Sequence, residues 1–206
     1  ENNPMLDLAV GLHPSSVADV EQKEFEEMMT YLNHPQVVAV GEIGLDYYWT
    51  DEHKDLQKQR FIEQINLANQ NNLPIIVHLR SSKEDIKDIL ISNPSNKKGV
   101  IHCYTETKEY MDIFLNMGYY IGFGGILTFK NGENVRELLL NCPKDRILSE
   151  TDAPYLAPVP KRGKMNQPSY VLYTCNEMAK LLGMKNDDLS SLISENYQRL
   201  FERTKL

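Results

Sequence analysis

Short apolar runs and amphipathic stretches alternate along the whole chain, and this alternation limits the folds that the sequence can adopt. The runs are the length of strands, and such continuous apolar runs are typical of strands buried on both faces. They cover residues 6–12, 37–44, 73–80, 99–104, 119–125 and 146–154. Stretches with helical spacing of hydrophobic residues follow at 20–33, 54–71, 83–92, 108–116, 133–141, 169–182 and 187–201. Repeated strand–helix units form right-handed crossovers, so we expect an α/β fold with a parallel sheet.

Length and composition narrow the class of protein further. A chain of 206 residues fits one domain with a substantial core, so we expect a single domain over residues 1–206. The net charge of −7 disfavours a protein that coats long nucleic acid with a basic surface, but not an enzyme that grips a few phosphates through metal ions. Three cysteines without a CxxC pair predict reduced thiols and a cytoplasmic location. No run approaches the length of a membrane span.

Glu42 stands out because it interrupts an apolar run between Gly41 and Gly44. Burying a carboxylate there would cost several kcal/mol unless a positive group faced it. The glycines permit a tight backbone where a side chain would collide. The alternative is a side chain that simply turns out into solvent.

Residues that can bind metal or titrate recur where the predicted strands end. They are Glu42, His78, His102 and Asp152, and His13 makes a fifth. In a parallel barrel all these strand ends open onto one face, so the side chains would converge. Each alone could be a structural histidine or a turn aspartate, but recurrence on successive strands favours a metal site. Imidazole and carboxylate suit zinc, manganese or magnesium, in a site that could hydrolyse phosphodiesters, phosphomonoesters or amides.

Five segments resemble, in order, the motifs of the TatD family of metal-dependent nucleases, which adopt a TIM-type (β/α)8 barrel. The segments are Gly11-Leu12-His13-Pro14, Gly41 to Tyr47, His78-Leu79-Arg80, His102-Cys103-Tyr104 and Glu150 to Leu156. A loop around Arg162 resembles the last loop of the family. The resemblance covers essentially the whole chain.

The resemblance implies a deoxyribonuclease, commonly a 3′ to 5′ exonuclease, that uses two divalent ions (Mg, Mn or Zn) and a metal-activated water. By this likeness Glu42 would bridge the ions, and His78 and His102 would hold the second one. Asp152 would hold the first ion and orient the water, so that Glu42 and Asp152 would be the catalytic residues. The residues implied to contact the DNA are His13, Arg80, Tyr104 and Arg162.

The sequence departs from the family at its start. Family members open with a His-x-His strand that supplies two ligands to the first metal, and no histidine precedes His13 here. Six strand–helix units are visible where a closed barrel has eight, so one or two units are expected to be missing and the first metal site incomplete. We expect a longer natural protein, a pairing with another copy, or a degenerate relative. The alternatives to a nuclease are a metal-dependent hydrolase of a small ester, lactone or amide, and a non-catalytic TatD-like protein.

Overall fold

The computed structural model describes residues 6–49 and 52–201. These residues form two compact units. One runs as far as Val100 and includes Leu200 and Phe201, and the other covers Ile101–Arg199. That residues 1–206 are a single domain stays a prediction. None of the helices in the described ranges has the length and hydrophobicity needed to cross a membrane, and the cytoplasmic location also stays a prediction.

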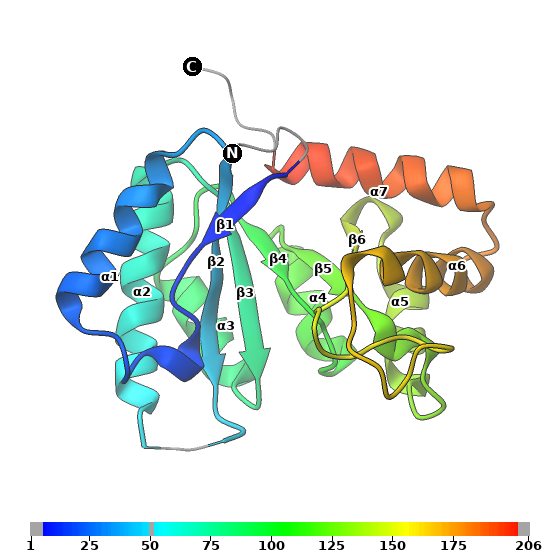
Figure 1. The fold of residues 1–206 in the computed structure, drawn as a ribbon, viewed down its shortest axis with the longest axis horizontal. Coiled ribbons are helices and arrows are strands. Elements are labelled where there is room, and N and C mark those ends of the chain that lie inside the picture. Colours follow the sequence, from blue (N-terminus) through cyan, green and yellow to red (C-terminus); the bar gives the residue numbers. More distant parts are fainter. Residues whose placement is uncertain (1–5, 50–51, 202–206) are drawn as a thin grey trace. The chain divides into compact units, whose positions relative to one another are not determined.

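The first unit is built on parallel strands that neighbour one another in chain order (Figure 1). They are β1 (Leu8–Val10), β2 (Val37–Asp46), β3 (Ile75–Arg80) and the start of β4 (Gly99–Ile101). The helical elements of this unit are η1 (Pro14–Ser16), α1 (Gln22–Met29), η2 (Thr30–Asn33), α2 (Lys54–Gln70) and α3 (Lys83–Ser92). The parallel pairing confirms the strand–helix alternation predicted for this part of the chain.

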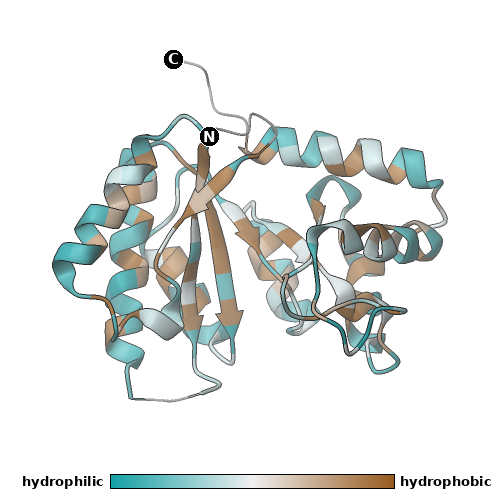
Figure 2. Cartoon of the chain, in the orientation of Figure 1, coloured by the Kyte–Doolittle hydropathy of each residue, from teal (hydrophilic) through white to brown (hydrophobic). Residues whose placement is uncertain are grey.

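Strand β2 forms the centre of the first unit's core. Eight of its ten residues are buried, and Figure 2 shows β2 and β3 as largely hydrophobic ribbons. Helix α2 contributes Phe61, Ile65 and Ala68, none of which is exposed to solvent. These three residues are the apolar stripe that the sequence predicts, and burying such a stripe against a sheet stabilises both elements.

The second unit repeats the same design. Its strands β5 (Tyr120–Phe123) and β6 (Ile147–Ser149) pair in parallel, and the amide of Tyr104 donates to the carbonyl of Gly122 at 3.0 Å. Asn196 holds the last helix in place, because its Nδ2 donates to the carbonyls of Lys144 and Ile147 at 2.8 Å each. The helical elements are α4 (Lys108–Asn116), η3 (Gly125–Thr128), α5 (Glu133–Asn141), η4 (Lys144–Arg146), η5 (Pro168–Tyr170), α6 (Val171–Leu181) and α7 (Asn186–Phe201).

Three strands differ from their predicted extents in ways that affect the candidate site. Strand β2 runs to Asp46, so Glu42 lies inside it and not at its end. Strand β4 ends at Ile101 and β6 ends at Ser149. His102 and Asp152 therefore lie in the turns that directly follow these strands, and Asp152 has a positive φ of 56°.

Candidate functional site

Glu42 and His78 lie on neighbouring strands of the first unit. The pairing of β2 with β3 sets Gly44 opposite His78, but the register shifts between Val40 and Ile43. Irregularities of this kind bend a strand and re-aim its side chains. Glu42 lies within the shifted segment, and its side chain is 38% exposed.

His13 is positioned by the segment that follows β1. The amide of Leu12 donates to Oε1 of Gln64 at 2.6 Å, and Nε2 of Gln64 donates back to the carbonyl of Leu12 at 3.2 Å. Gln64 is 1% exposed, so this pair of bonds fixes the backbone just before His13 from the core. His13 is in turn the N-cap residue of η1.

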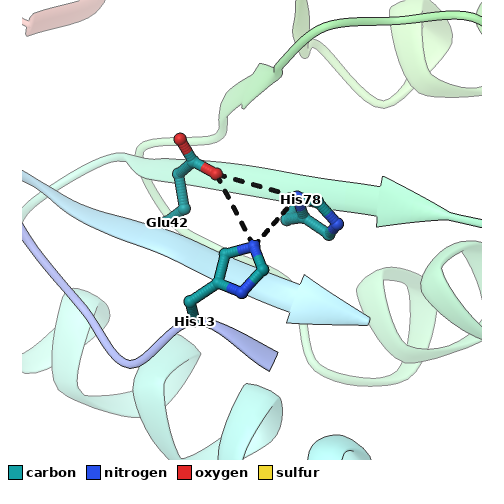
Figure 3. Close-up of side chains that lie close together, drawn as sticks. All are labelled: His13, Glu42 and His78. Atoms are coloured by element: carbon teal, nitrogen blue, oxygen red, sulfur yellow. Dashed lines mark hydrogen bonds and ion pairs between the residues drawn. The ribbon is translucent and has the colours of Figure 1, made fainter. Parts of the chain in front are cut away.

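His13, Glu42 and His78 point toward one another (Figure 3). Nδ1 of His78 lies 3.7 Å from Oε2 of Glu42, and Nε2 of His13 lies 3.9 Å from the same oxygen. The two facing imidazole nitrogens are 3.2 Å apart. The structure thus brings two predicted metal ligands together with His13, for which the family resemblance implies a contact with the substrate.

Asp46 determines which nitrogen of His78 carries the proton, and so leaves the nitrogen nearer Glu42 unprotonated. Its carboxylate is 4% exposed and its Oδ2 lies 3.1 Å from Nε2 of His78. A carboxylate can only accept, so Nε2 of His78 carries the proton and donates it. The neutral ring then offers the lone pair of Nδ1 toward Glu42, which is the arrangement that carboxylate–histidine–metal groups use.

His13 directs its protonated nitrogen into the group, whereas His78 directs its unprotonated nitrogen there. The backbone amide of Ser15 donates to Nδ1 of His13 at 3.1 Å, so Nδ1 must be unprotonated in this geometry. The neutral ring therefore carries its proton on Nε2, which points toward Nδ1 of His78. His13 is thus prepared to donate a hydrogen bond into the group, whereas His78 is prepared to supply a lone pair.

Replacing Asp46 by Asn is expected to weaken metal binding. The Asn side chain has one oxygen and one NH2 group in place of two carboxylate oxygens. Its NH2 group would therefore face a donor in either orientation, either Nε2–H of His78 or the amide of Tyr48, both of which donate to Asp46 at present. Loss of such an orienting partner typically lowers metal affinity by about 10- to 100-fold. Titration calorimetry with Mn²⁺ would measure the change, with D112N, which alters an exposed ion pair, as the matched control. Equal affinities of D46N and the unmodified protein would contradict the orienting role.

The second unit brings His102, Glu150 and Asp152 together. His102 is 8% exposed, and its Nδ1 lies 3.6 Å from Oε1 of Glu150. His102 and Asp152 each offer a ligand atom, and these two atoms lie within 4.8 Å of each other. Oε1 of Glu150 is buried and has no hydrogen-bond partner among the described residues. A buried carboxylate oxygen without a donor suits a nearby cation.

Arg80 and Arg162, both predicted to contact the substrate, have exposed side chains. The guanidinium carbon of Arg80 lies 4.0 Å from the ring centroid of Tyr48. That of Arg162 lies 3.9 Å from the ring centroid of Phe129. Both cations therefore rest on an aromatic face at the surface.

Tyr104, the remaining residue predicted to contact the substrate, is buried. It is 2% exposed, and its hydroxyl donates to the carbonyl of Thr107 at 2.8 Å. Burial raises the pKa of Tyr104 well above its usual range. Its contact with a substrate stays a prediction.

Two residues of these groups received no role in the sequence analysis. They are Asp46 and Glu150. Asp46 is four positions beyond Glu42, and Glu150 is two positions before Asp152. Glu42 and Asp46 both lie on β2, and residues an even number apart on a strand share a face, so this spacing was the available signal for Asp46. Glu150 lies beyond the end of β6, and strand spacing gives no signal for it.

The residues of both groups fit a divalent cation. In the first unit, the 3.7 Å between His78 Nδ1 and Glu42 Oε2 is less than the roughly 4 Å spanned by one zinc–nitrogen and one zinc–oxygen bond. In the second, a buried Glu150 oxygen without a hydrogen-bond donor lies 3.6 Å from the His102 imidazole, which itself lies within ligand range of the Asp152 carboxylate. Imidazole nitrogen and carboxylate oxygen are donors that zinc, manganese and magnesium accept to different degrees.

Comparisons with known proteins agree with the motifs. The family profile described as TatD related DNase matches residues 1–202. The uncharacterized metal-dependent hydrolase YabD of Bacillus subtilis is 41% identical over 194 residues, which are 94% of this chain and 76% of YabD. The uncharacterized metal-dependent hydrolase YcfH of Escherichia coli is 42% identical over 192 residues, 93% of this chain and 72% of YcfH.

Solved structures give the same fold. The E. coli TatD homologue YJJV aligns with a TM-score of 0.93 at 28% identity, over 98% of this chain and 79% of YJJV. An E. coli phosphotriesterase homology protein aligns with a TM-score of 0.66 at 18% identity, over 95% of this chain and 74% of that protein. These likenesses confirm the predicted α/β fold of TIM-barrel type. The chain belongs to the TatD family, as its motifs predict.

Proposed function

We propose that this protein is a metal-dependent hydrolase that cleaves phosphodiester bonds in DNA. The observation that carries the proposal is the group of His13, Glu42 and His78, in which Asp46 leaves the Nδ1 lone pair of His78 facing Glu42. Membership of a family described as TatD-related DNases favours DNA over other phosphodiesters and over esters or amides.

Four residues are the proposed ligands of two divalent ions, Mg²⁺, Mn²⁺ or Zn²⁺: Glu42, His78, His102 and Asp152. Such ions, when bound, activate a water molecule and neutralise charge on the phosphate oxygens. Glu42 is proposed to bridge the ions, and Asp152 to orient the water. Asp46 keeps the His78 ring in its orientation throughout.

His13 and the exposed arginines are proposed to hold the substrate. The Nε2–H of His13 donates to Nδ1 of His78, 3.2 Å away. If that Nδ1 lone pair held an ion, the Nε2–H of His13 would become available to donate to a phosphate oxygen. Hydrogen bonds from prearranged donors to phosphate oxygens are stronger than those between neutral groups. Arg80 and Arg162 are proposed to contact the phosphates of the strand.

Removal of metal tests this function. Protein treated with EDTA and then desalted is expected to leave single-stranded DNA intact, and added Mg²⁺ or Mn²⁺ is expected to restore cleavage. Metal content, measured by elemental analysis, should rise and fall with activity. Cleavage that persists in EDTA would contradict a metal-dependent reaction.

Parallel substrates separate the alternatives. A small ester or lactone that is hydrolysed while DNA is not would make the protein a hydrolase of small molecules. Folded protein that retains no metal and cleaves neither substrate would make it a non-catalytic relative. The family resemblance implies a 3′ to 5′ exonuclease. A circular single strand has no ends, so cleavage of a linear strand alone would support an exonuclease, and a 5′ label would report the direction.

A further inference from the structure

Two aromatic side chains stand in solvent directly after the strand that carries Glu42. Tyr48 is 58% exposed and Trp49 is 72% exposed. Tryptophan is on average among the more buried residues, so a ring this exposed has no role in the core. An exposed aromatic face can stack on a flat ligand such as a base.

Arg80 gathers the two rings into one cluster. The Tyr48 and Trp49 rings meet edge to face, with centroids 4.9 Å apart and planes at 89°. The guanidinium carbon of Arg80 lies 4.0 Å from the Tyr48 centroid and 5.2 Å from the Trp49 centroid. These contacts restrain the rings while both remain open to solvent.

The cluster lies next to the candidate metal ligands of the same unit. Arg80 pairs with Asp46 across β2 and β3, and it shares a strand face with His78 two residues earlier. The amide of Tyr48 donates to Oδ1 of Asp46 at 3.0 Å, while Oδ2 of the same carboxylate faces His78. Two hydrogen bonds through one side chain therefore connect the backbone of the cluster to the imidazole.

The neighbouring residue Tyr47 anchors the start of this loop. Its hydroxyl donates to Oδ2 of Asp85 at 2.7 Å, and Nζ of Lys58 lies 2.7 Å from the same oxygen. The hydrogen bond from Lys58 lowers the pKa of Asp85 below its usual value, so the carboxylate stays charged at neutral pH. The loop thus leaves β2 along a fixed path before it presents Tyr48 and Trp49.

The cluster has the chemical groups needed to bind a single nucleotide unit, a base and its phosphate. Within the described ranges, no hydrogen bond or ion pair involves the guanidinium of Arg80, and a guanidinium lying on a ring keeps its in-plane N–H donors available for phosphate. Trp49 also lines a hollow of about 130 Å³ that reaches Ser15, two residues from His13. A flat ring beside a guanidinium is the combination that binds a base and its phosphate.

We propose that Trp49 stacks on an unpaired base of single-stranded DNA while Arg80 binds the adjacent phosphate. This proposal rests on the proposed function and deepens it. Bases inside a duplex have both faces covered by their neighbours, so the cluster selects frayed or single-stranded ends. Stacking does not read base identity, because every base has a π-face.

Trp49 is the only tryptophan in the chain, so its fluorescence reports on this site alone. Metal-free protein in EDTA would be titrated with oligothymidylate, with an abasic strand of the same length, and with a blunt duplex. We expect saturable quenching by oligothymidylate, and binding about tenfold or more weaker for the abasic strand and the duplex. Equal affinity for the abasic strand would overturn the proposal, and so would no quenching by any strand.

Substitutions separate this proposal from the proposed function. W49A is expected to raise the KM for single-stranded DNA about tenfold or more with little change in kcat, and W49F is expected to restore most of the loss. The matched control is Y31A, which removes a ring that is 60% exposed in η2, before the amino end of β2. An unchanged KM in W49A would overturn the stacking role while leaving DNA cleavage intact. Quenching by DNA that is never cleaved would refute the nuclease function and keep the stacking site.

Discussion

The E42Q variant is expected to hydrolyse DNA about 10³-fold more slowly or worse, while it folds normally. Gln keeps the size of the side chain but removes the charge that faces His78 and His13, so the proposed bridging ligand is lost. A divalent ion held by these residues would supply an activated water, and its binding would depend on the ligands that hold it. The measurement is kcat on single-stranded DNA at saturating Mn²⁺, together with bound metal per chain.

The control for this variant is E26Q, which neutralises an exposed glutamate of α1 that accepts a hydrogen bond from Nε2 of Gln22 at 2.8 Å. It should leave kcat within about twofold, because exposed pairs of this kind contribute little. Full activity in E42Q would refute the bridging role. Lost activity with unchanged metal content would show that Glu42 acts in the reaction without being a metal ligand.

The G44A variant is expected to lose about 3 kcal/mol or more of its free energy of unfolding. Gly44 has a φ of 144°, which side chains rarely adopt, and a Cβ there would overlap the carbonyl oxygen of His78 on β3. Both effects act at once, because a strained backbone costs about 1–3 kcal/mol and the overlap would push β2 and β3 apart. Urea denaturation followed by circular dichroism would measure the loss.

G183A is the matched control, since Gly183 also has a positive φ, 62°, but its added Cβ would meet nothing within 4 Å. Backbone strain alone should cost about 1 kcal/mol there. If G44A were no less stable than G183A, the close approach of β2 to β3 would not be what requires glycine.

The sequence predicted helices better than strand ends. The helices at 83–92, 108–116 and 133–141 have the predicted bounds, because hydrophobic periodicity reports directly on a helix. The predicted run 99–104 gives a strand that stops at Ile101, since the chain turns at Cys103 with a φ of 46°. A left-handed turn by a non-glycine residue leaves no signal in a hydrophobic pattern.

The types of residue in the site were predictable, but their contacts were not. His78 and Glu42 stood out as polar groups at the ends of apolar runs. The bond between Asp46 and His78 depends on the register of β2 against β3, which is set by side-chain packing over the whole strand pair. The proton on His13 likewise depends on one backbone amide, that of Ser15.

The double use of Asp46 has a thermodynamic consequence. One carboxylate restrains both the imidazole of His78 and the amide of Tyr48. Any ligand that makes the loop more rigid also restricts the motion of the imidazole. A ligand that fixes the imidazole restricts the loop in turn, and the coupling free energy is the same in both directions. Occupancy by a strand and occupancy by an ion would then be positively cooperative, so that an ion binds most tightly when a substrate is present.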